Sequence, residues 1–225
     1  MSMARRLRPF LLLGAVCGVL AQAAPPLSPT LQAELERAVR AYESGSHGTA
    51  QAAFEALVRR GVPAAAYNLA VMHLRSEVPR PDLALARPLL ERAAAAGFVT
   101  AQLKLGQALE SGDLGPRDLV TAHRWYAVAA ESGSVDAQVA MGTAHYLGRG
   151  LPKDAVRAVH WFREAAKGGD VGAMYLLASM YEQGDGVERD LRLARYWYDV
   201  AAKNGDEAAP GKLRQIDAQL ARMPG

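Results

Sequence analysis

Residues 134–169 read SVDAQVAMGTAHYLGRGLPKDAVRAVHWFREAAKGG, and this stretch of 36 residues is one copy of a unit that recurs along the chain. The recurrence is clearest for glycine, tryptophan and aspartate. The positions are Gly61, Gly97, Gly133, Gly169 and Gly205; Trp125, Trp161 and Trp197; and Asp82, Asp118, Asp154 and Asp190. A fixed period of this length is typical of stacked repeat architectures. The sequence therefore predicts a repetitive scaffold with one core running along its length.

Each full unit has the pattern of a first helix, a turn, a second helix and a closing glycine. Gly112, Gly148 and Gly184 fall where the first helix must end, and glycine tolerates the left-handed conformation common there. The recurring aspartates fall where the second helix begins, where their side chains accept bonds from free backbone N–H groups. Because helix pairs with short connections pack antiparallel, we predict an all-α fold. It is an α/α solenoid of stacked antiparallel helix pairs that winds as a right-handed superhelix.

Recurring alanines on both helices are expected to let neighbouring helices approach closely. The bulky tryptophans and leucines would then fill the remaining buried space. On this interpretation, truncating Trp161 to alanine should cost roughly 3–5 kcal/mol of stability.

The repeats divide the chain into five segments. We expect a signal peptide at 1–23, a linker at 24–29, an atypical N-terminal helix pair at 30–61, four 36-residue repeats over 62–205 and a C-terminal capping helix at 206–225. Terminal repeats of such arrays are atypical because one side faces solvent.

The N-terminal segment has the three parts of a secretory signal peptide. Residues 1–8 hold three arginines and no acid, and residues 9–20 are apolar but too few to span a bilayer of roughly 30 Å. Residues 21–23, Ala-Gln-Ala, fit the small-x-small cleavage pattern. We therefore expect secretion across the inner membrane to the periplasm, with no stable membrane insertion after cleavage. A short anchor that stays attached is the alternative.

Composition narrows the classes of partner and site. The whole chain has 26 Lys and Arg against 23 Asp and Glu, and the three arginines of the signal peptide account for the excess. A neutral mature chain gives no case for nucleic acid or an anionic membrane as partner. Cys17, the only cysteine, lies inside the signal peptide. No disulfide and no sulfur-ligated metal are therefore expected in the mature protein.

Charge distinguishes the two helices of each repeat. The first-helix segments 64–75, 100–111, 136–147 and 172–183 together hold five charged residues, whereas the four second-helix segments hold 17. We therefore expect the second helices to form the charged outer wall. The first helices should line the concave wall, which is the usual docking surface of repeat proteins.

One stripe of the first helices is the predicted partner-binding surface. It lies opposite the packing stripe at about 100° per residue, and it mixes apolar, aromatic and a few polar side chains, as protein-binding surfaces do. We call it the first-helix face, and its members are Tyr67, Val71, Leu103, Gln107, Val139, Thr143, Tyr146, Tyr175 and Ser179. For Leu103 and Val139, packing against the next first helix is the alternative.

Several motifs of the repeat resemble those of a known family. They are the A-x-x-x-L-G pattern of 101–106, the G-x-G turn of 148–150, and the A-x-x-W-[YF]-x-x-A-A-x-x-G pattern of 122–133 and 158–169. Over about residues 61–205 the chain resembles Sel1-like repeats, which are related to tetratricopeptide repeats. The resemblance implies an α/α solenoid. It also implies an adaptor for protein complexes, of a kind that bacteria often export to the cell envelope.

The histidines and the periodic glutamates are assigned no chemistry. His73 and His145 are expected to pack half-buried, and His123 and His160 are expected at the surface. No ligand-spaced partner accompanies any of them, so no metal site is predicted. Glu110 and Glu182 are related by the repeat period rather than placed for catalysis.

The sequence shows no nucleophile–base–acid arrangement and no H-E-x-x-H, P-loop or S-x-x-K motif. We predict an exported, non-catalytic scaffold that binds a protein or peptide of the cell envelope in the concave groove, without catalytic residues, metal or cofactor. Two alternatives stay open. One is an enzyme acting on cell-wall or β-lactam substrates, an activity associated with cysteine-rich relatives. The other is recognition of envelope polysaccharide through Tyr67, Tyr146 and Tyr175.

Overall fold

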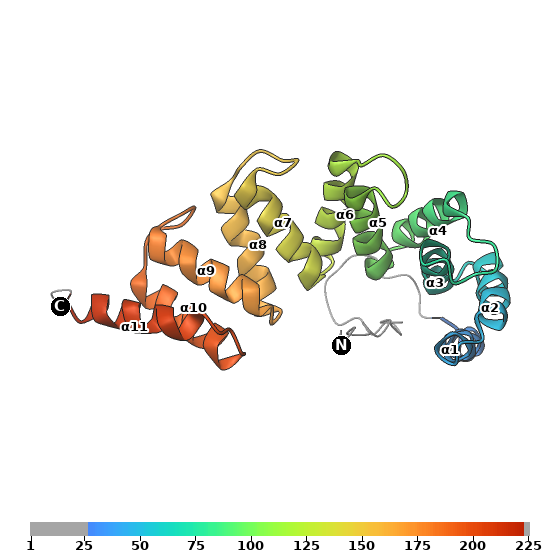
Figure 1. The fold of residues 1–225 in the computed structure, drawn as a ribbon, viewed down its shortest axis with the longest axis horizontal. Helices are drawn as coiled ribbons and strands as arrows, with labels where there is room; N and C mark the ends of the chain where they lie inside the picture. Colours follow the sequence, from blue (N-terminus) through green and yellow to red (C-terminus); the bar gives the residue numbers. More distant parts are fainter. Residues whose placement is uncertain (1–26, 223–225) are drawn as a thin grey trace, which may run out of the picture. The chain divides into compact units, whose positions relative to one another are not determined.

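The structure is a computed structural model that describes residues 27–222 (Figure 1). Over this range it contains eleven helices and no strand. The helices are α1 (Pro29–Glu43), α2 (His47–Arg59), α3 (Pro63–Leu74), α4 (Leu83–Ala95), α5 (Val99–Ser111), α6 (Leu119–Glu131), α7 (Val135–Leu147), α8 (Ala155–Lys167), α9 (Val171–Gln183), α10 (Leu191–Lys203) and α11 (Ala209–Leu220). The predicted all-α solenoid is confirmed, and its handedness stays a prediction. The predicted signal peptide and residues 24–26 of the predicted linker lie outside the described residues, and Pro29, the last residue of that linker, already begins α1.

The chain forms two compact units that divide within α5. The first unit runs to Leu105 and includes 113–116, and the second comprises 106–112 and the chain from Arg117 onward. From α1 to α4 in the first unit, and from α6 to α11 in the second, each helix packs against the next one in the sequence. In the first unit, α1 to α3 bury a core that includes Phe54, Leu57 and Met72. In the second, α8 to α11 bury a core that includes Phe162, Leu177 and Tyr198.

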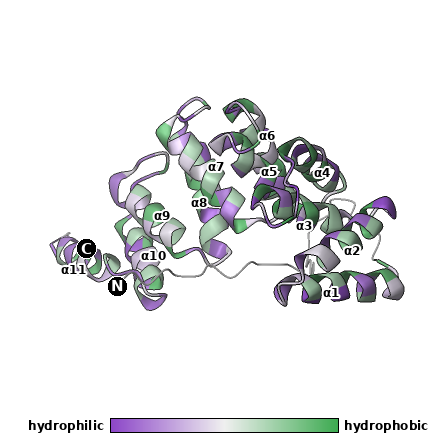
Figure 2. Cartoon of the chain, turned by 45° about the vertical axis from the view of Figure 1, so that its right-hand side comes forward, coloured by the Kyte–Doolittle hydropathy of each residue, from purple (hydrophilic) through white to green (hydrophobic). Residues whose placement is uncertain are grey.

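Helix α1 is amphipathic, which explains why it pairs with α2. Figure 2 shows hydrophilic and hydrophobic residues alternating around α1, whose buried side chains are Leu35, Ala38, Val39 and Tyr42. These four residues recur at intervals of one turn, so they form one stripe toward α2. The polar face remains in solvent.

The predicted caps of the second helices are confirmed. The side-chain carboxylate of each recurring aspartate accepts a hydrogen bond from a backbone N–H in the first turn of its helix, and each cap stabilises the helix by about 1 kcal/mol. The pairs are Asp82 with Ala84, Asp118 with Thr121, Asp154 with Arg157, and Asp190 with Arg192 and Leu193. Ser134 and Asp170, which the sequence analysis did not single out, cap α7 and α9 in the same way.

The predicted left-handed glycines are also present. Gly148 and Gly184 end α7 and α9 with φ angles of 69° and 76°. Gly112 has a φ of 90° at the corresponding position of the preceding repeat. In the first repeat this position holds Ser76, which adopts a φ of 56°. The backbone geometry of the turn is thus kept where the glycine is lost.

The tryptophans do not fill the core, contrary to the prediction. Trp125, Trp161 and Trp197 are half-buried, whereas the residue after each one is 3% exposed or less: Tyr126, Phe162 and Tyr198. Successive side chains on a helix differ in direction by about 100°, so only one of two adjacent aromatics can point fully inward. In two repeats a glycine of the preceding helix makes room for the inward ring. A Cβ on Gly106 would lie 2.6 Å from the Tyr126 ring, and one on Gly142 would lie 2.7 Å from the Phe162 ring.

Candidate partner-binding face

The nine residues of the first-helix face fall into two groups, one in each compact unit. The first-unit group, on α3 and the start of α5, is Tyr67, Val71 and Leu103. The second-unit group, on the end of α5, α7 and α9, is Gln107, Val139, Thr143, Tyr146, Tyr175 and Ser179.

The first-unit group offers little surface. Val71 is buried, with 9% of its surface exposed, while Tyr67 and Leu103 are half-buried. The Tyr67 ring is tilted against Phe98 with ring centroids 5.5 Å apart. Burial raises the pKa of the Tyr67 hydroxyl, and Arg75 opposes this weakly. This end of the predicted face is therefore mainly a packing surface.

The second-unit group keeps more of its surface in solvent. Gln107 is exposed and the other five residues are half-buried. Val139, Tyr146 and Tyr175 pack on one side against the core of the second unit. Tyr146 meets Phe162 edge-on at 6.5 Å, and Tyr175 meets Tyr198 edge-on at 5.1 Å. Each of these two half-buried rings therefore packs against a fully buried ring.

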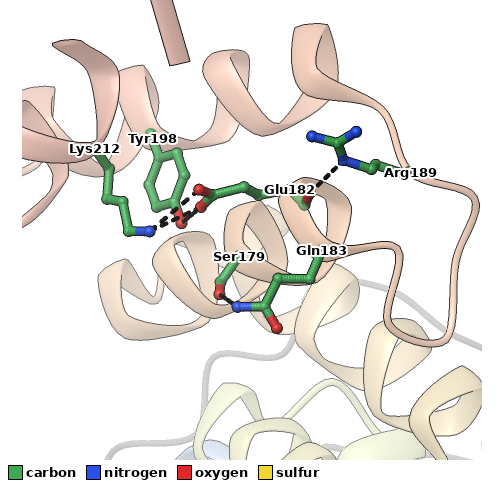
Figure 3. Close-up of polar contacts among 6 residues, drawn as sticks. All are labelled: Ser179, Glu182, Gln183, Arg189, Tyr198 and Lys212. Atoms are coloured by element: carbon green, nitrogen blue, oxygen red, sulfur yellow. Dashed lines mark hydrogen bonds and ion pairs between the residues drawn. The ribbon is translucent and has the colours of Figure 1, made fainter. Parts of the chain in front are cut away.

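A polar cluster that the sequence analysis did not predict lies beside Tyr175 and Ser179. Tyr198 Oη donates to the Glu182 carboxylate at 2.7 Å, and Lys212 Nζ lies 3.1 and 3.2 Å from its two oxygens (Figure 3). The Glu182 side chain is only 14% exposed and that of Lys212 is 30% exposed. The cluster therefore joins α9, α10 and α11 through a largely buried ion pair.

The same arrangement occurs two repeats earlier. Tyr126 Oη donates to Glu110 at 2.7 Å, and Arg149 takes the place of the lysine at 3.3 Å. In the repeat between them, the corresponding pair is Tyr146 and Phe162. The residue that faces the buried ring is thus a glutamate where that ring is a tyrosine, and it is Tyr146 where that ring is Phe162. Glu110 and Glu182 are 72 residues apart, which is two repeat periods, and this spacing was the sequence signal that both form the same contact with a buried tyrosine.

The tyrosine hydroxyls of these clusters act as hydrogen-bond donors. Burial raises the pKa of Tyr198, and the hydrogen bond to Glu182 raises it further. Tyr126 is affected in the same direction by burial and by Glu110. Both phenols therefore stay protonated at physiological pH and stabilise the carboxylates next to them.

We expect Tyr198→Phe to lower the free energy of unfolding by about 1.5 kcal/mol. A hydrogen bond to a charged group contributes roughly 1.5–3 kcal/mol, and Glu182 retains Lys212 when the hydroxyl is lost, which favours the low end. Urea denaturation would measure the change. Tyr175→Phe is the control, because the Tyr175 hydroxyl makes no hydrogen bond within the described residues. Equal losses in the two variants would contradict the role given to the Glu182 bond.

The histidines differ from the prediction at one position. His123 is buried, at 5% exposed, although it was expected at the surface, while His160 is exposed as predicted. The reason is that Gly150, from the turn of the next repeat, covers the ring, since a Cβ on Gly150 would lie 2.6 Å from it. His73 and His145 are 4% and 5% exposed, which is more buried than expected.

The first unit has a pocket of about 240 Å³ between α1 and α2, and no residue of the first-helix face lines it. It is lined largely by Ala38, Ala41, Ala53, Ala56 and Leu57. Among residues 27–222, no group of three or more His, Cys, Asp or Glu side chains is placed to hold a metal ion. Within the same range, none of the helices has the length and apolar character needed to cross a membrane.

A chain of repeated helix pairs, with supported aromatic rings on its first helices, is by its fold a helical-repeat scaffold. The Sel1 repeat matches residues 63–98, 99–134, 135–170 and 171–206. The chain therefore belongs to the Sel1 repeat family, whose repeats commonly serve as protein-interaction modules.

Solved structures of the same family are similar over most of the chain. A Sel1 repeat protein from Oxalobacter formigenes is 27% identical with a TM-score of 0.77, and the match covers 84% of this chain and 78% of that one. A protective antigen present in uropathogenic Escherichia coli strains, which displays an SLR fold, is 28% identical with a TM-score of 0.78 over 85% of this chain. This chain spans only 42% of that antigen. A putative Sel1 repeat protein from Klebsiella pneumoniae is 25% identical with a TM-score of 0.50, and the match covers 83% of this chain and 93% of that one. Among curated proteins, none matches the sequence.

Proposed function

We propose that this protein is an exported, non-catalytic scaffold that binds a protein or peptide of the cell envelope through the second-unit group of the first-helix face. The observation that carries the proposal is the support of Tyr146 and Tyr175 by buried rings. Rings that are fixed before binding lose little conformational freedom on contact, and tyrosine is enriched among the residues that dominate binding energy.

The chemistry around these rings suits a peptide. Thr143 and Ser179 place hydroxyl groups beside the two tyrosines on α7 and α9, and Ser179 Oγ accepts a bond from Gln183 at 3.1 Å. Lys153 Nζ lies 5.9 Å from the centre of the Tyr146 ring, at the edge of the face. Apolar contact with a few polar groups is the usual composition of a docking surface.

The carboxylates near the face favour a scaffold over an enzyme. Both oxygens of Glu182 lie within 3.2 Å of Lys212, and one of them accepts from Tyr198. Glu110 is held in the same way by Tyr126 and Arg149. A general base needs a carboxylate that reaches substrate, whereas these two are engaged with their own repeats. Export is proposed from the composition of 1–23.

Capture from an envelope extract tests the proposed face. We expect the full chain to retain one or more specific partners, and Tyr175→Ala and Val139→Asp to weaken binding at least tenfold, because each removes part of the apolar contact. Matched controls are Tyr196→Ala and Val128→Asp, which change exposed residues of second helices. Affinity for the captured partner would then be measured by calorimetry.

Thr143→Arg is a second variant of the same face that leaves the packed residues intact, so it covers the case in which Val139→Asp does not fold. Undiminished capture by the three face variants would contradict the proposed surface. Hydrolysis of nitrocefin or peptidoglycan would overturn the non-catalytic assignment, and retention of polysaccharide alone would replace the protein partner. Absence of the protein from the periplasmic fraction would contradict export.

A further inference from the structure

Two buried histidines in the second unit have no role in the proposed docking face. His123 lies on α6 and His145 on α7, helices that pack against each other. Both are 5% exposed, and the Nδ1 atom of each is buried without a hydrogen-bond partner. Buried polar atoms are nearly always paired, so an unpaired one calls for an explanation.

The other repeats show that the fold does not require histidine at either position. The residue equivalent to His123 in the next repeat is Val159, which is 3% exposed. The neighbouring equivalents of His145 are Leu109, a buried apolar residue, and Tyr181, whose hydroxyl accepts a bond from Arg163 at 2.9 Å. Even His73, two repeats earlier, has a partner, since its Nδ1 accepts the Asp82 N–H at 3.0 Å.

Charged groups from the neighbouring elements act on His123. Burial lowers the pKa of His123, the Glu110 carboxylate on α5 opposes this, and His145 on α7 and Arg149 in the following turn lower it slightly. The Leu119 backbone carbonyl, one turn earlier on α6, also raises the pKa of His123, although it does not complete a hydrogen bond to Nδ1. Glu110 is already bound by Tyr126 and Arg149, so it is a poor partner for a new imidazolium.

We propose that His123 makes the contact between α6 and α7, which we call the α6–α7 joint, sensitive to protons: the two helices pack closely at neutral pH, and their contact loosens in mildly acidic conditions. An imidazolium at His123 would be a buried cation held under the Gly150 turn, where little water can reach it. Opening the joint would disturb α7, the helix that carries Val139, Thr143 and Tyr146. This pH effect comes from contacts within the chain, so it is expected whether or not a partner binds.

The direction of the pH effect follows from proton uptake. An unfolded histidine has a pKa of about 6.5, and that of His123 is lower in the folded chain. Below about pH 6.5 the unfolded state therefore binds more protons, and stability falls as pH falls. For His123 the loss amounts to at most a tenfold drop in the folding equilibrium constant per pH unit while its imidazole stays uncharged in the folded chain.

Urea denaturation at pH 7.5 and pH 5.5 tests the joint, with substitutions taken from the neighbouring repeats. We expect the wild-type folding constant to fall by up to tenfold for His123 alone. The double variant His123→Val with His145→Leu should remove that part of the pH dependence. His160→Gln, at an exposed histidine, should leave it unchanged. A double variant with the same pH dependence as the wild type would overturn the proposal.

NMR and hydrogen exchange test the wild-type chain directly, in case the variants fail to fold. The His123 ring resonance should titrate at lower pH than a histidine in a short peptide. Amides of α6 and α7 should exchange faster at pH 5.5, after correction for intrinsic rates, relative to those of α9 and α10. A His123 that titrates like the peptide, or uniform exchange across these helices, would contradict the joint.

Discussion

Replacing Phe162 with alanine is expected to lower the free energy of unfolding by about 3–5 kcal/mol. The Phe162 ring is 1% exposed in the core of the second unit. Truncating it removes apolar surface from the interior and leaves a cavity that the surrounding helices fill only in part. Urea denaturation followed by circular dichroism at pH 7.5 would give the change directly.

The neighbouring Trp161→Ala is the matched control. Its side chain is larger but only half-buried, so we expect a smaller loss, about 1–2 kcal/mol. A Trp161 loss equal to or above that of Phe162 would contradict the inward position of Phe162.

A double-mutant cycle tests the fit of Phe162 against Gly142. In the first repeat, Ala70 and Leu90 occupy the corresponding positions. Gly142→Ala should therefore destabilise the wild type, since its Cβ would lie 2.7 Å from the Phe162 ring. It should be tolerated better with Phe162→Leu. Additive effects in the cycle would show that the two side chains do not share this space.

The repeat period predicted the helix order and the capping residues because both depend on local chemistry. An aspartate before a helix and a glycine after one act within a few residues. The inward aromatic was mispredicted for the opposite reason. Trp161 and Phe162 belong to the same repeating pattern, and what separates them is the space left by Gly142, which comes from another helix. The 36-residue recurrence of a residue shows that its position is part of the repeat, but it does not show which way the side chain points.

For the candidate site too, the sequence predicted which residues share one face of a helix but not their contacts with other helices. The 100° rotation per residue placed Tyr146 and Tyr175 on a common stripe, and the structure finds both half-buried. The Glu182 cluster was not predicted, because Tyr198 and Lys212 reach it from two later helices. His123 was misplaced because the turn that covers it belongs to the next repeat. Contacts between different repeats were missed because the repeat pattern describes one unit and not how its side chains meet those of the next.

Gly186→Ala is expected to lower the free energy of unfolding by about 2–5 kcal/mol, because two costs combine. Gly186 has a φ of 69°, and a side chain in this left-handed region costs roughly 1–2 kcal/mol. Its Cβ would also overlap the backbone carbonyl of Ala155 at the start of α8, which cannot rotate away. Overpacking of this kind adds about 1–3 kcal/mol.

Gly169→Ala separates the two costs. Gly169 has a φ of 95°, and no atom lies within 4 Å of its added Cβ, so only the backbone strain of roughly 1–2 kcal/mol should appear. Urea denaturation of the two variants side by side would measure the difference. If Gly186→Ala costs no more than Gly169→Ala, then the turn between α9 and α10 is free to lift from α8. If it costs more, the close contact of each turn with the preceding repeat is a packing constraint, and glycine at this position serves the stacking of repeats as well as the turn.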